Sequence, residues 1–267
     1  MQQSYNSNQP PRLLADFKRF TPLLRELVSR DIKVRYRHSV LGVIWTVLNP
    51  LLMMVVISFV FSTLFKQSIP NFPIYYLSGS VLFSFFSEST TNGLHAIIVN
   101  APLIKKVYIP QYMFPLSNVL SALVNLGFSL AAMLLMMIFT GAPFFPTLLL
   151  IPIPVFYTFI FSVGFALLLS ALTVFFRDIA HFYGVLILAW TYATPIFYPE
   201  SILPETALKL ERFNPLYHLI SFMRRLVLEG RFPGWKENLC CFLIGLGTLA
   251  LGLLVFRKKQ DKFVLYV

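Results

Sequence analysis

Six apolar stretches, each about as long as a lipid bilayer is thick, constrain the fold of this chain more than any other feature. A hydrocarbon layer of about 30 Å requires about 20 consecutive apolar residues in a helix. The sequence also has 57% hydrophobic and only 12% charged residues, too few charges for a water-soluble surface. We therefore predict an all-α integral membrane protein with six transmembrane helices, at residues 43–65, 74–94, 112–140, 147–176, 181–198 and 239–256.

A basic segment directly before the first apolar stretch orients the chain. Residues 30–51 read RDIKVRYRHSVLGVIWTVLNPL, and short segments rich in Lys and Arg remain on the cytoplasmic side of a membrane. This orientation places 15 of the 22 Lys and Arg residues, and both termini, in the cytoplasm. Topology and contact with anionic membrane lipids then account for the net charge of +11, so no nucleic acid is expected as a partner. We expect a multi-pass protein of the cell inner (plasma) membrane.

Several other sequence signals are absent. The first apolar run begins near residue 43 and is too long for the apolar region of a signal peptide, so we expect it to remain in the protein. Cys240 and Cys241 are adjacent and are poor partners for a disulfide. The scattered His95, His181 and His218 have no metal-ligand spacing, so neither a metal site nor a catalytic role is assigned.

The segment before the first span is predicted to lie in the membrane interface. Residues 1–12, rich in Gln, Ser and Asn, are expected to be a disordered tail. Residues 13–38 are expected to form an amphipathic helix, with a six-span domain at 39–267. Thr21 and Pro22 suit an N-cap and first helical position, which would break this helix in two. A soluble basic tail is the alternative. The apolar positions recur at spacings of three and four: Leu13, Phe17, Phe20, Leu24 and Leu27.

Two segments between spans are neither clean spans nor clean loops. Residues 100–118 hold two lysines among apolar residues and three prolines, which fits a short amphipathic helix or an ordinary loop with cytoplasmic lysines. Residues 192–231 are broken by four prolines, which interrupt any continuous helix. Irregular backbone at membrane depth is tolerated where protein buries it. We expect short re-entrant or interfacial helices there, with a turn at Asn214 and Pro215.

Four motifs in order carry a resemblance to a known family. They are the segment at 30–51, LIKKVYIPQYMFPLSN after the second span, FFRDI at 175–179, and TPIFYPESILPE followed by NPLYHLI. With these, nearly the whole chain resembles the permease subunits of type-2 ABC exporters for polysaccharides. That family includes O-antigen, capsule and teichoic acid exporters.

The resemblance implies a homodimer paired with two copies of a separate ATPase, moving a lipid-linked glycan from the cytoplasm to the outer face. The chain has no GxxxxGK[ST] phosphate loop, so it is not expected to be an enzyme by itself. No cofactor is expected on this chain; ATP and Mg would bind the partner. By analogy, residues 13–38 resemble a gate helix, 100–110 a cytoplasmic coupling helix and 202–229 external re-entrant helices.

The same analogy assigns residues to the two cytoplasmic elements. The gate helix and its interface would use Arg30, Lys33, Arg35 and Arg37. Coupling to the ATPase would use Asn100, Leu103, Lys105, Lys106, Tyr108 and Pro110.

A conduit for glycans needs surfaces that hold sugar rings weakly, which flat aromatic faces can do. In a chain with 28 Phe, any one aromatic can instead face lipid or the core. Glu88 falls within a span, where an ionisable side chain costs about 2.5 kcal/mol or more unless it has water or a partner. It would contact sugar hydroxyls or pair with a basic residue such as Arg35, unless it lies close enough to the interface to be solvated. The channel candidates are Tyr36, Trp45, Phe83, Phe85, Phe86, Glu88, Trp190, Tyr192, Phe197 and Tyr198.

Two other classes of function remain as alternatives. One is a type-2 ABC permease for a teichoic acid, a lipid or a drug, which would share the fold and differ in channel width. The other is a membrane glycosyltransferase or polymerase, whose catalytic groups would come from charged residues of the external segment. Those residues are Glu200, Glu205, Glu211, Arg224 and Arg225.

Overall fold

The computed structural model describes residues 13–37, 39, 41–64, 69–107 and 109–266. These residues form helices, turns and irregular segments and include no strand, so the all-α prediction is confirmed for them. The tail at 1–12 lies outside the described residues. The long helices are α1 (Leu13–Tyr36), α2 (Ile44–Leu64), α3 (Phe72–Val99), α5 (Met113–Thr140), α6 (Pro152–Phe175), α7 (Ile179–Ala193) and α10 (Trp235–Lys259).

Short helices connect or end the long ones. They are α4 (Ala101–Ile104), η1 (Pro146–Leu150), η2 (Glu200–Ile202), α8 (Glu205–Glu211), α9 (Pro215–Arg224), η3 (Arg225–Glu229), η4 (Gln260–Lys262) and α11 (Phe263–Tyr266).

Four helical segments within the described residues are long and apolar enough to cross a membrane. They contain α2, α5, α6 and α10, so the chain has the character of a multi-pass membrane protein. The other two predicted spans correspond to α3, which falls short in hydropathy, and α7, which has 15 residues. At 1.5 Å per residue α7 is about 22 Å long, shorter than the hydrocarbon layer. Four of the six predicted spans therefore coincide with helices that are long and apolar enough to cross a membrane.

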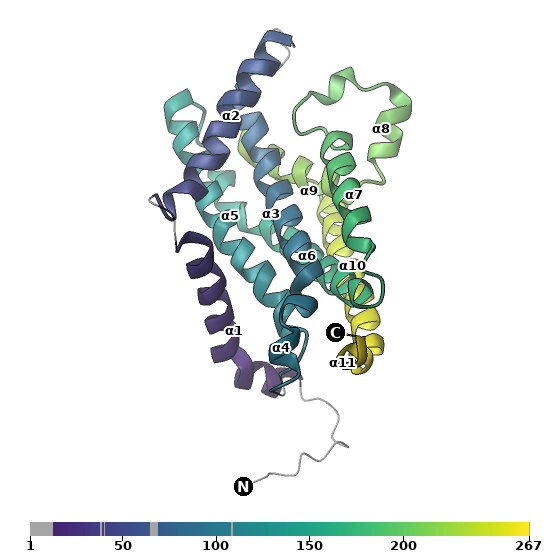
Figure 1. The fold of residues 1–267 in the computed structure, drawn as a ribbon. Helices are drawn as coiled ribbons and strands as arrows, with labels where there is room; N and C mark the ends of the chain where they lie inside the picture. Colours follow the sequence, from purple (N-terminus) through teal and green to yellow (C-terminus); the bar gives the residue numbers. More distant parts are fainter. Residues whose placement is uncertain (1–12, 38, 40, 65–68, 108, 267) are drawn as a thin grey trace.

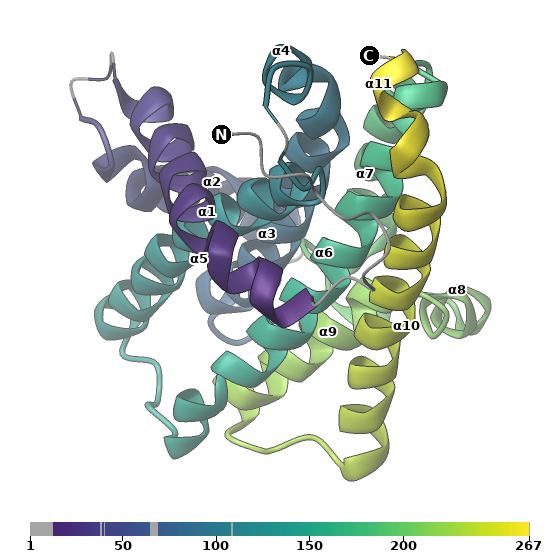
Figure 2. The same ribbon diagram turned by 90° about the horizontal axis from the view of Figure 1, so that it is seen from below.

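The bundle is built around α6 and α3. Helix α6 packs against α10 on one side and α3 on another, and α3 also packs against α5. Helices α1 and α2 lie against α5 (Figure 1). Seen from below, α1 crosses the end of the bundle while α10 and α7 run along its other side (Figure 2). Helices α1, α4 and α11 lie toward one end of the molecule, and α8 lies at the opposite end (Figure 1).

Helix α1 is continuous from Leu13 to Tyr36, with Pro22 inside it, so the predicted break at Thr21 did not form. An internal proline removes one backbone hydrogen bond and costs about 3 kcal/mol. Leu24 and Leu27, one turn apart just after the proline, are buried where α1 contacts α5. Burial of these two leucines stabilises the protein by about 1.5–3 kcal/mol each, enough to offset the cost of the proline in the helix. The predicted end at residue 38 lies outside the described residues.

Helix α7 ends at Ala193, five residues before the predicted end at 198. Residues 194–199 are irregular, and Thr194, Pro195 and Ile196 are buried. The turn predicted at Asn214 and Pro215 is present: the Asn214 side chain accepts a hydrogen bond from the backbone N–H of Leu216, and Pro215 is the first residue of α9.

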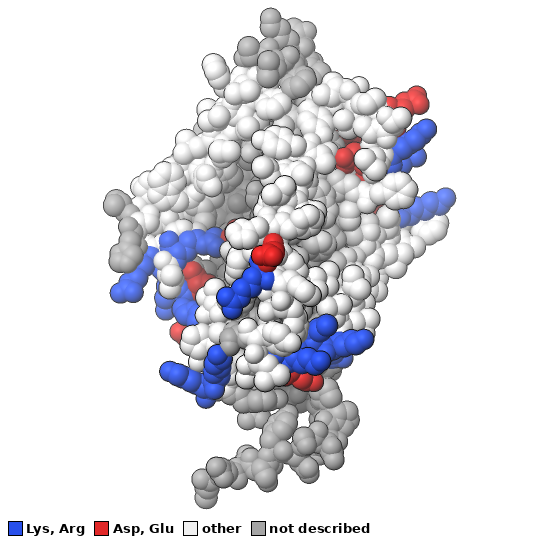
Figure 3. All heavy atoms as spheres, turned by 45° about the vertical axis from the view of Figure 1, so that its right-hand side comes forward, with Lys and Arg blue, Asp and Glu red and all other residues white. Residues whose placement is uncertain are grey.

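Charged side chains avoid much of the surface. On the face drawn in Figure 3, Lys and Arg gather toward the lower part, and a second group lies at the upper right. Uncharged surface separates the two groups (Figure 3). The charged side chains on this face are therefore confined to two groups, and the rest of the face is uncharged.

Candidate functional site

Two adjoining cavities run along one face of α3. The larger has a volume of about 540 Å³ and lies between the end of α1, the start of α2, α3 and α5. The smaller has a volume of about 490 Å³ and is bounded by α2, α3 and the segment that follows α7. Both are lined by the same five residues, so they form one path: Met53, Tyr76, Ser80, Ser84 and Glu88.

The wall that α3 gives to this path is polar. Tyr76, Ser80, Ser84, Glu88 and Asn92 recur every four residues, a spacing that aligns side chains along one face of a helix. Each of them lines at least one cavity. Small hydroxyls leave room beside the helix, and each can donate and accept hydrogen bonds. This stripe also lowers the hydropathy of α3, which explains why α3 does not resemble an ordinary span.

A polar network joins three helices at the larger cavity. Arg35 of α1 forms an ion pair with Glu88 of α3. The Asn125 Nδ2 of α5 donates to the Glu88 Oε1 at 2.7 Å, and the Tyr36 hydroxyl donates to the Asn125 Oδ1 at 3.4 Å. The pairing of Glu88 with Arg35, one of the two contacts predicted for this carboxylate, is therefore present. Because both side chains are partly exposed, the pair itself is worth only about 0.2–1 kcal/mol.

Four of the predicted aromatic residues line the path. Tyr36 and Trp45 line the larger cavity. Phe83 and Phe197 line the smaller one, where the Phe197 ring stacks on Tyr76 with 5.8 Å between ring centroids. The path is therefore lined by both flat apolar rings and hydroxyls.

The remaining aromatic candidates lie elsewhere. Phe85 and Phe86 are buried, and Phe86 stacks on Phe161 of α6 with ring centroids 5.0 Å apart. Trp190 packs edge-on against Phe86 and donates from Nε1 to the Asn214 Oδ1 at 2.8 Å, joining α7 to the start of α9. These contacts are packing contacts within the bundle.

Tyr192 and Tyr198 lie near the end of α7. Tyr192 is 65% exposed. The Tyr198 hydroxyl donates to the carbonyls of Tyr192 and Ala193, which closes the end of α7. Neither residue lines one of the two cavities.

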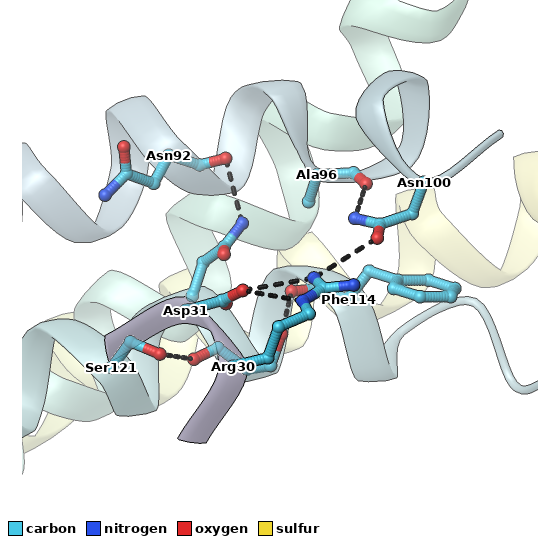
Figure 4. A network of polar contacts seen from close by, with 9 residues as sticks. Arg30, Asp31, Asn92, Ala96, Asn100, Phe114 and Ser121 are labelled. Carbon is cyan, nitrogen blue, oxygen red and sulfur yellow. Dashed lines mark hydrogen bonds and ion pairs between the residues drawn. The ribbon is translucent and has the colours of Figure 1, made fainter. Parts of the chain in front are cut away.

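The predicted coupling segment adjoins α1 through Arg30 and Asn100. Asn100 lies between α3 and α4, and its Nδ2 donates to the Ala96 carbonyl at 2.8 Å. Its Oδ1 accepts from the Arg30 Nη2 at 3.4 Å, and Arg30 also pairs with Asp31 at 3.0 Å (Figure 4). Lys105 follows α4 and is exposed. The end of α3 and the C-terminal part of α1 are thus in direct contact.

The other described gate and coupling candidates line neither of the two cavities. Tyr108 lies outside the described residues. Leu103 and Pro110 are partly exposed, and Lys33, Arg37 and Lys106 are exposed.

Most of the charged residues considered for a membrane enzyme are held in structural contacts. Glu200 accepts a hydrogen bond from the Tyr217 hydroxyl at 3.0 Å, and Arg225 pairs with Glu237. Burial raises the pKa of the Glu211 carboxyl, and a hydrogen bond from Asn214 partly opposes that rise. No three His, Cys, Asp or Glu residues in the described part of the chain are placed to hold a metal ion.

Sequence reasoning missed most of the polar residues of the path. These are Thr46, Asn49, Ser80, Ser84, Asn125 and Ser129 of the larger cavity and Ser87, Thr91, Asn92 and Thr191 of the smaller one. The four-residue spacing of polar side chains within an otherwise apolar helix was the signal that could have found the α3 stripe.

Comparisons with known proteins agree on one family. A family model described as ABC-2 type transporter matches residues 22–228. An O-antigen export system permease protein of Klebsiella pneumoniae is 31% identical over 242 residues, which cover 90% of this chain and 93% of that protein. One of Myxococcus xanthus is 31% identical over 256 residues, covering 94% and 98%. A polysialic acid transport protein of Escherichia coli is 22% identical over 242 residues, covering 88% and 92%.

Proposed function

The chain belongs to the ABC-2 type transporter family, and from that membership we propose that it is the membrane-spanning subunit of an ATP-driven exporter of a cell-surface polysaccharide. Members of this kind are transport subunits without catalytic activity of their own, so the glycosyltransferase alternative is set aside. The relatives named for O-antigen and polysialic acid export support a polysaccharide as the cargo.

One observation carries the proposal beyond family membership: the path along α3 suits a polymer of sugars. Sugar rings present hydroxyls at their edges and apolar faces above and below. Ser80 and Ser84 offer exchangeable hydrogen bonds, and Tyr76, Trp45 and Phe197 offer flat faces. Each contact is weak and is repeated along the path. A chain of sugars can therefore slide from one set of contacts to the next without being held.

The proposed topology has six spans, with both termini in the cytoplasm. In it α3 is the second span, made polar because it faces the path, and α7 is the short fifth span. Helices α8 and α9 then lie at the outer face, and α1 and α4 lie at the cytoplasmic face of the inner membrane. The positive charge of the predicted cytoplasmic segments supports this orientation.

The proposed assembly has two copies of this chain and two copies of a separate ATPase, with ATP and Mg bound by the ATPase. The segment from Asn100 to Pro110, with Lys105 exposed beside α4, is the proposed ATPase contact. Because Asn100 also contacts Arg30, movement of this segment would reach α1 and the larger cavity. The proposed cargo is a lipid-linked glycan.

The test uses cells depleted of the chain and complemented with variants. Without the chain, lipid-linked polymer should accumulate on the cytoplasmic leaflet, detected by mass spectrometry and by labelling with a membrane-impermeant reagent. Ser84→Trp, which fills the path, should reproduce this accumulation. Leu254→Trp, on the exposed side of α10, is the matched control and should export normally.

Two results would redirect the proposal. Loss of a lipid or of drug resistance with unchanged glycans would favour the permease for a small cargo. Unchanged export with Ser84→Trp would show that the polymer does not follow the α3 path.

A further inference from the structure

Arg224, the last residue of α9, is a buried arginine that has no carboxylate within ion-pair distance among the described residues. Its exposed fraction is 6%, and none of the ion pairs among the described residues includes it. Its Nε has no hydrogen-bond partner within the described part of the protein. Burying a charge without a partner destabilises a protein, so the groups that surround Arg224 must stabilise its guanidinium.

The Arg224 guanidinium is held in a notch on α3. Its Cζ lies 3.7 Å from the centroid of the Tyr75 ring, a cation–π contact. Gly79, one turn along α3 from Tyr75, leaves the space that the guanidinium occupies. A Cβ at Gly79 would lie 3.0 Å from the Arg224 Nη2 and 3.3 Å from the Ile220 Cγ2.

The hydrogen bonds of Arg224 go to the irregular segment after α7. Its Nη2 donates to the Pro195 carbonyl at 2.7 Å and to the Ile196 carbonyl at 3.4 Å. The Tyr75 hydroxyl donates to the Tyr198 carbonyl at 2.9 Å. Backbone carbonyls that have left a helix inside a membrane protein need donors from the protein itself. Two side chains, from α9 and α3, therefore hold residues 195–198 in place.

The same irregular segment forms a wall of the smaller cavity. Ile196 and Phe197 line it opposite the stripe on α3. The Phe197 ring stacks on Tyr76, and also on Phe61 of α2 with 6.0 Å between centroids. A shift of residues 195–198 would move this wall.

We propose that Arg224 is a positioning residue that sets the width of the smaller cavity by holding residues 195–198 against α3. The planar guanidinium is suited to this role because it stacks on Tyr75 and donates at the same time. A lysine keeps the charge but has no flat face and no fixed fork of donors. The inference rests on the proposed conduit and concerns its geometry.

The test measures access to the path in detergent-solubilised membranes from cells that produce the full-length chain. A reporter cysteine replaces Ser80, which lines both cavities, in a chain whose two native cysteines are changed to alanine. We expect Arg224→Lys to raise the rate at which a water-soluble methanethiosulfonate reagent modifies the reporter cysteine, by at least about tenfold. Removing a hydrogen bond to a charged group shifts a conformational equilibrium by about that factor.

The matched control is Arg225→Lys. Arg225 is the next residue, pairs with Glu237 and lines neither cavity, so the modification rate should stay unchanged. Gly79→Ala is a second variant, whose Cβ would lie 3.0 Å from the Arg224 Nη2 and would press on the guanidinium while keeping the arginine, and it should also raise the rate. The melting temperature of each solubilised variant separates a change of cavity width from general unfolding.

An unchanged modification rate of the reporter cysteine in both Arg224→Lys and Gly79→Ala would overturn the inference. So would an equal rise in Arg225→Lys, or a rise matched by loss of the folded protein. The assay contains no glycan, so its outcome is independent of whether the cargo is a polysaccharide.

Discussion

At the scale of single residues, Glu88 shows how this membrane protein accommodates a charge. An isolated carboxylate at the depth of a span costs about 2.5 kcal/mol or more. Arg35 supplies an opposite charge and Asn125 supplies a hydrogen-bond donor, so the carboxylate is satisfied inside the path. The three groups come from three helices, and their contacts hold the end of α1 against α3 and α5.

Removing the charge of Glu88 and removing the charge of Arg35 should lower the stability of the protein by different amounts. Glu88→Gln keeps an acceptor for Asn125, so we expect a loss of stability below about 1 kcal/mol, together with reduced export because α1 is released. Arg35→Met leaves the carboxylate without its cation and should destabilise the protein more. The double variant should recover most of that stability. Thermal unfolding of the purified protein and polysaccharide at the cell surface are the two measurements.

The opposite pattern would contradict this account. If Glu88→Gln changes neither stability nor export, the carboxylate is solvated and has no role in the path. If the double variant is no more stable than Arg35→Met, the two residues do not interact energetically.

The sequence predicted the pairing of Glu88 but not the residues around it. The cost of a charge within a span is a local argument, so it identified Glu88 and gave a basic residue such as Arg35 as one of its possible partners. The choice between Phe83 and its neighbours Phe85 and Phe86 depends on which face of α3 packs on α6. Three phenylalanines within four residues give no local reason to prefer one of them, so that choice required the tertiary structure.

At the scale of elements, α6 and α10 pack through glycines. A Cβ on Gly164 would lie 2.5 Å from the backbone of Thr248 and Leu249, and one on Gly252 would overlap the Gly164 carbonyl. Without side chains at these positions, the two backbones approach closely. Small residues at such contacts stabilise membrane helix pairs through van der Waals packing.

Adding one methyl group should therefore separate these helices. We expect Gly252→Ala to destabilise the protein by roughly 1–3 kcal/mol, the usual cost of overpacking. Gly247→Ala is the matched control in the same helix, because a Cβ there meets no atom within 4 Å. It should be neutral or stabilising by up to about 1 kcal/mol, since alanine favours helix more than glycine. Thermal unfolding in detergent measures both, and equal effects would contradict close packing at Gly252.

Element boundaries were predictable where they follow from local chemistry. The spans predicted at 43–65 and 112–140 match Ile44–Leu64 and Met113–Thr140 closely, because an apolar run ends where polar or turn residues begin. The end of α7 was placed too late because Ile196, Phe197 and Tyr198 continue the apolar run beyond Pro195. Pro195 restricts Thr194 to extended backbone, which predicts a helix end there. The predicted span followed the apolar run instead.

At the scale of the whole molecule, α2 is bound to the rest of the chain along a narrow strip. In its apolar window only 6% of residues are buried, which is Met54 alone. The face that carries Trp45, Asn49 and Met53 lines the cavities, while Phe59 is 77% exposed. A helix that borders a polar path and has so few intramolecular contacts is where we expect the proposed second copy to complete the conduit.

This arrangement predicts contact between the α2 helices of two copies. A cysteine at Phe59, in a chain without its native cysteines, should form a disulfide-linked dimer in membranes under mild oxidation. The product should migrate near twice the 30.6 kDa of one chain. A cysteine at Leu254, equally apolar and 68% exposed on α10, should remain monomeric because α10 lies on the far side of α6 and is expected to face lipid. Cross-linking at Leu254 but not at Phe59 would place the second copy against α10, and the path along α3 would then be completed by lipid or by another protein.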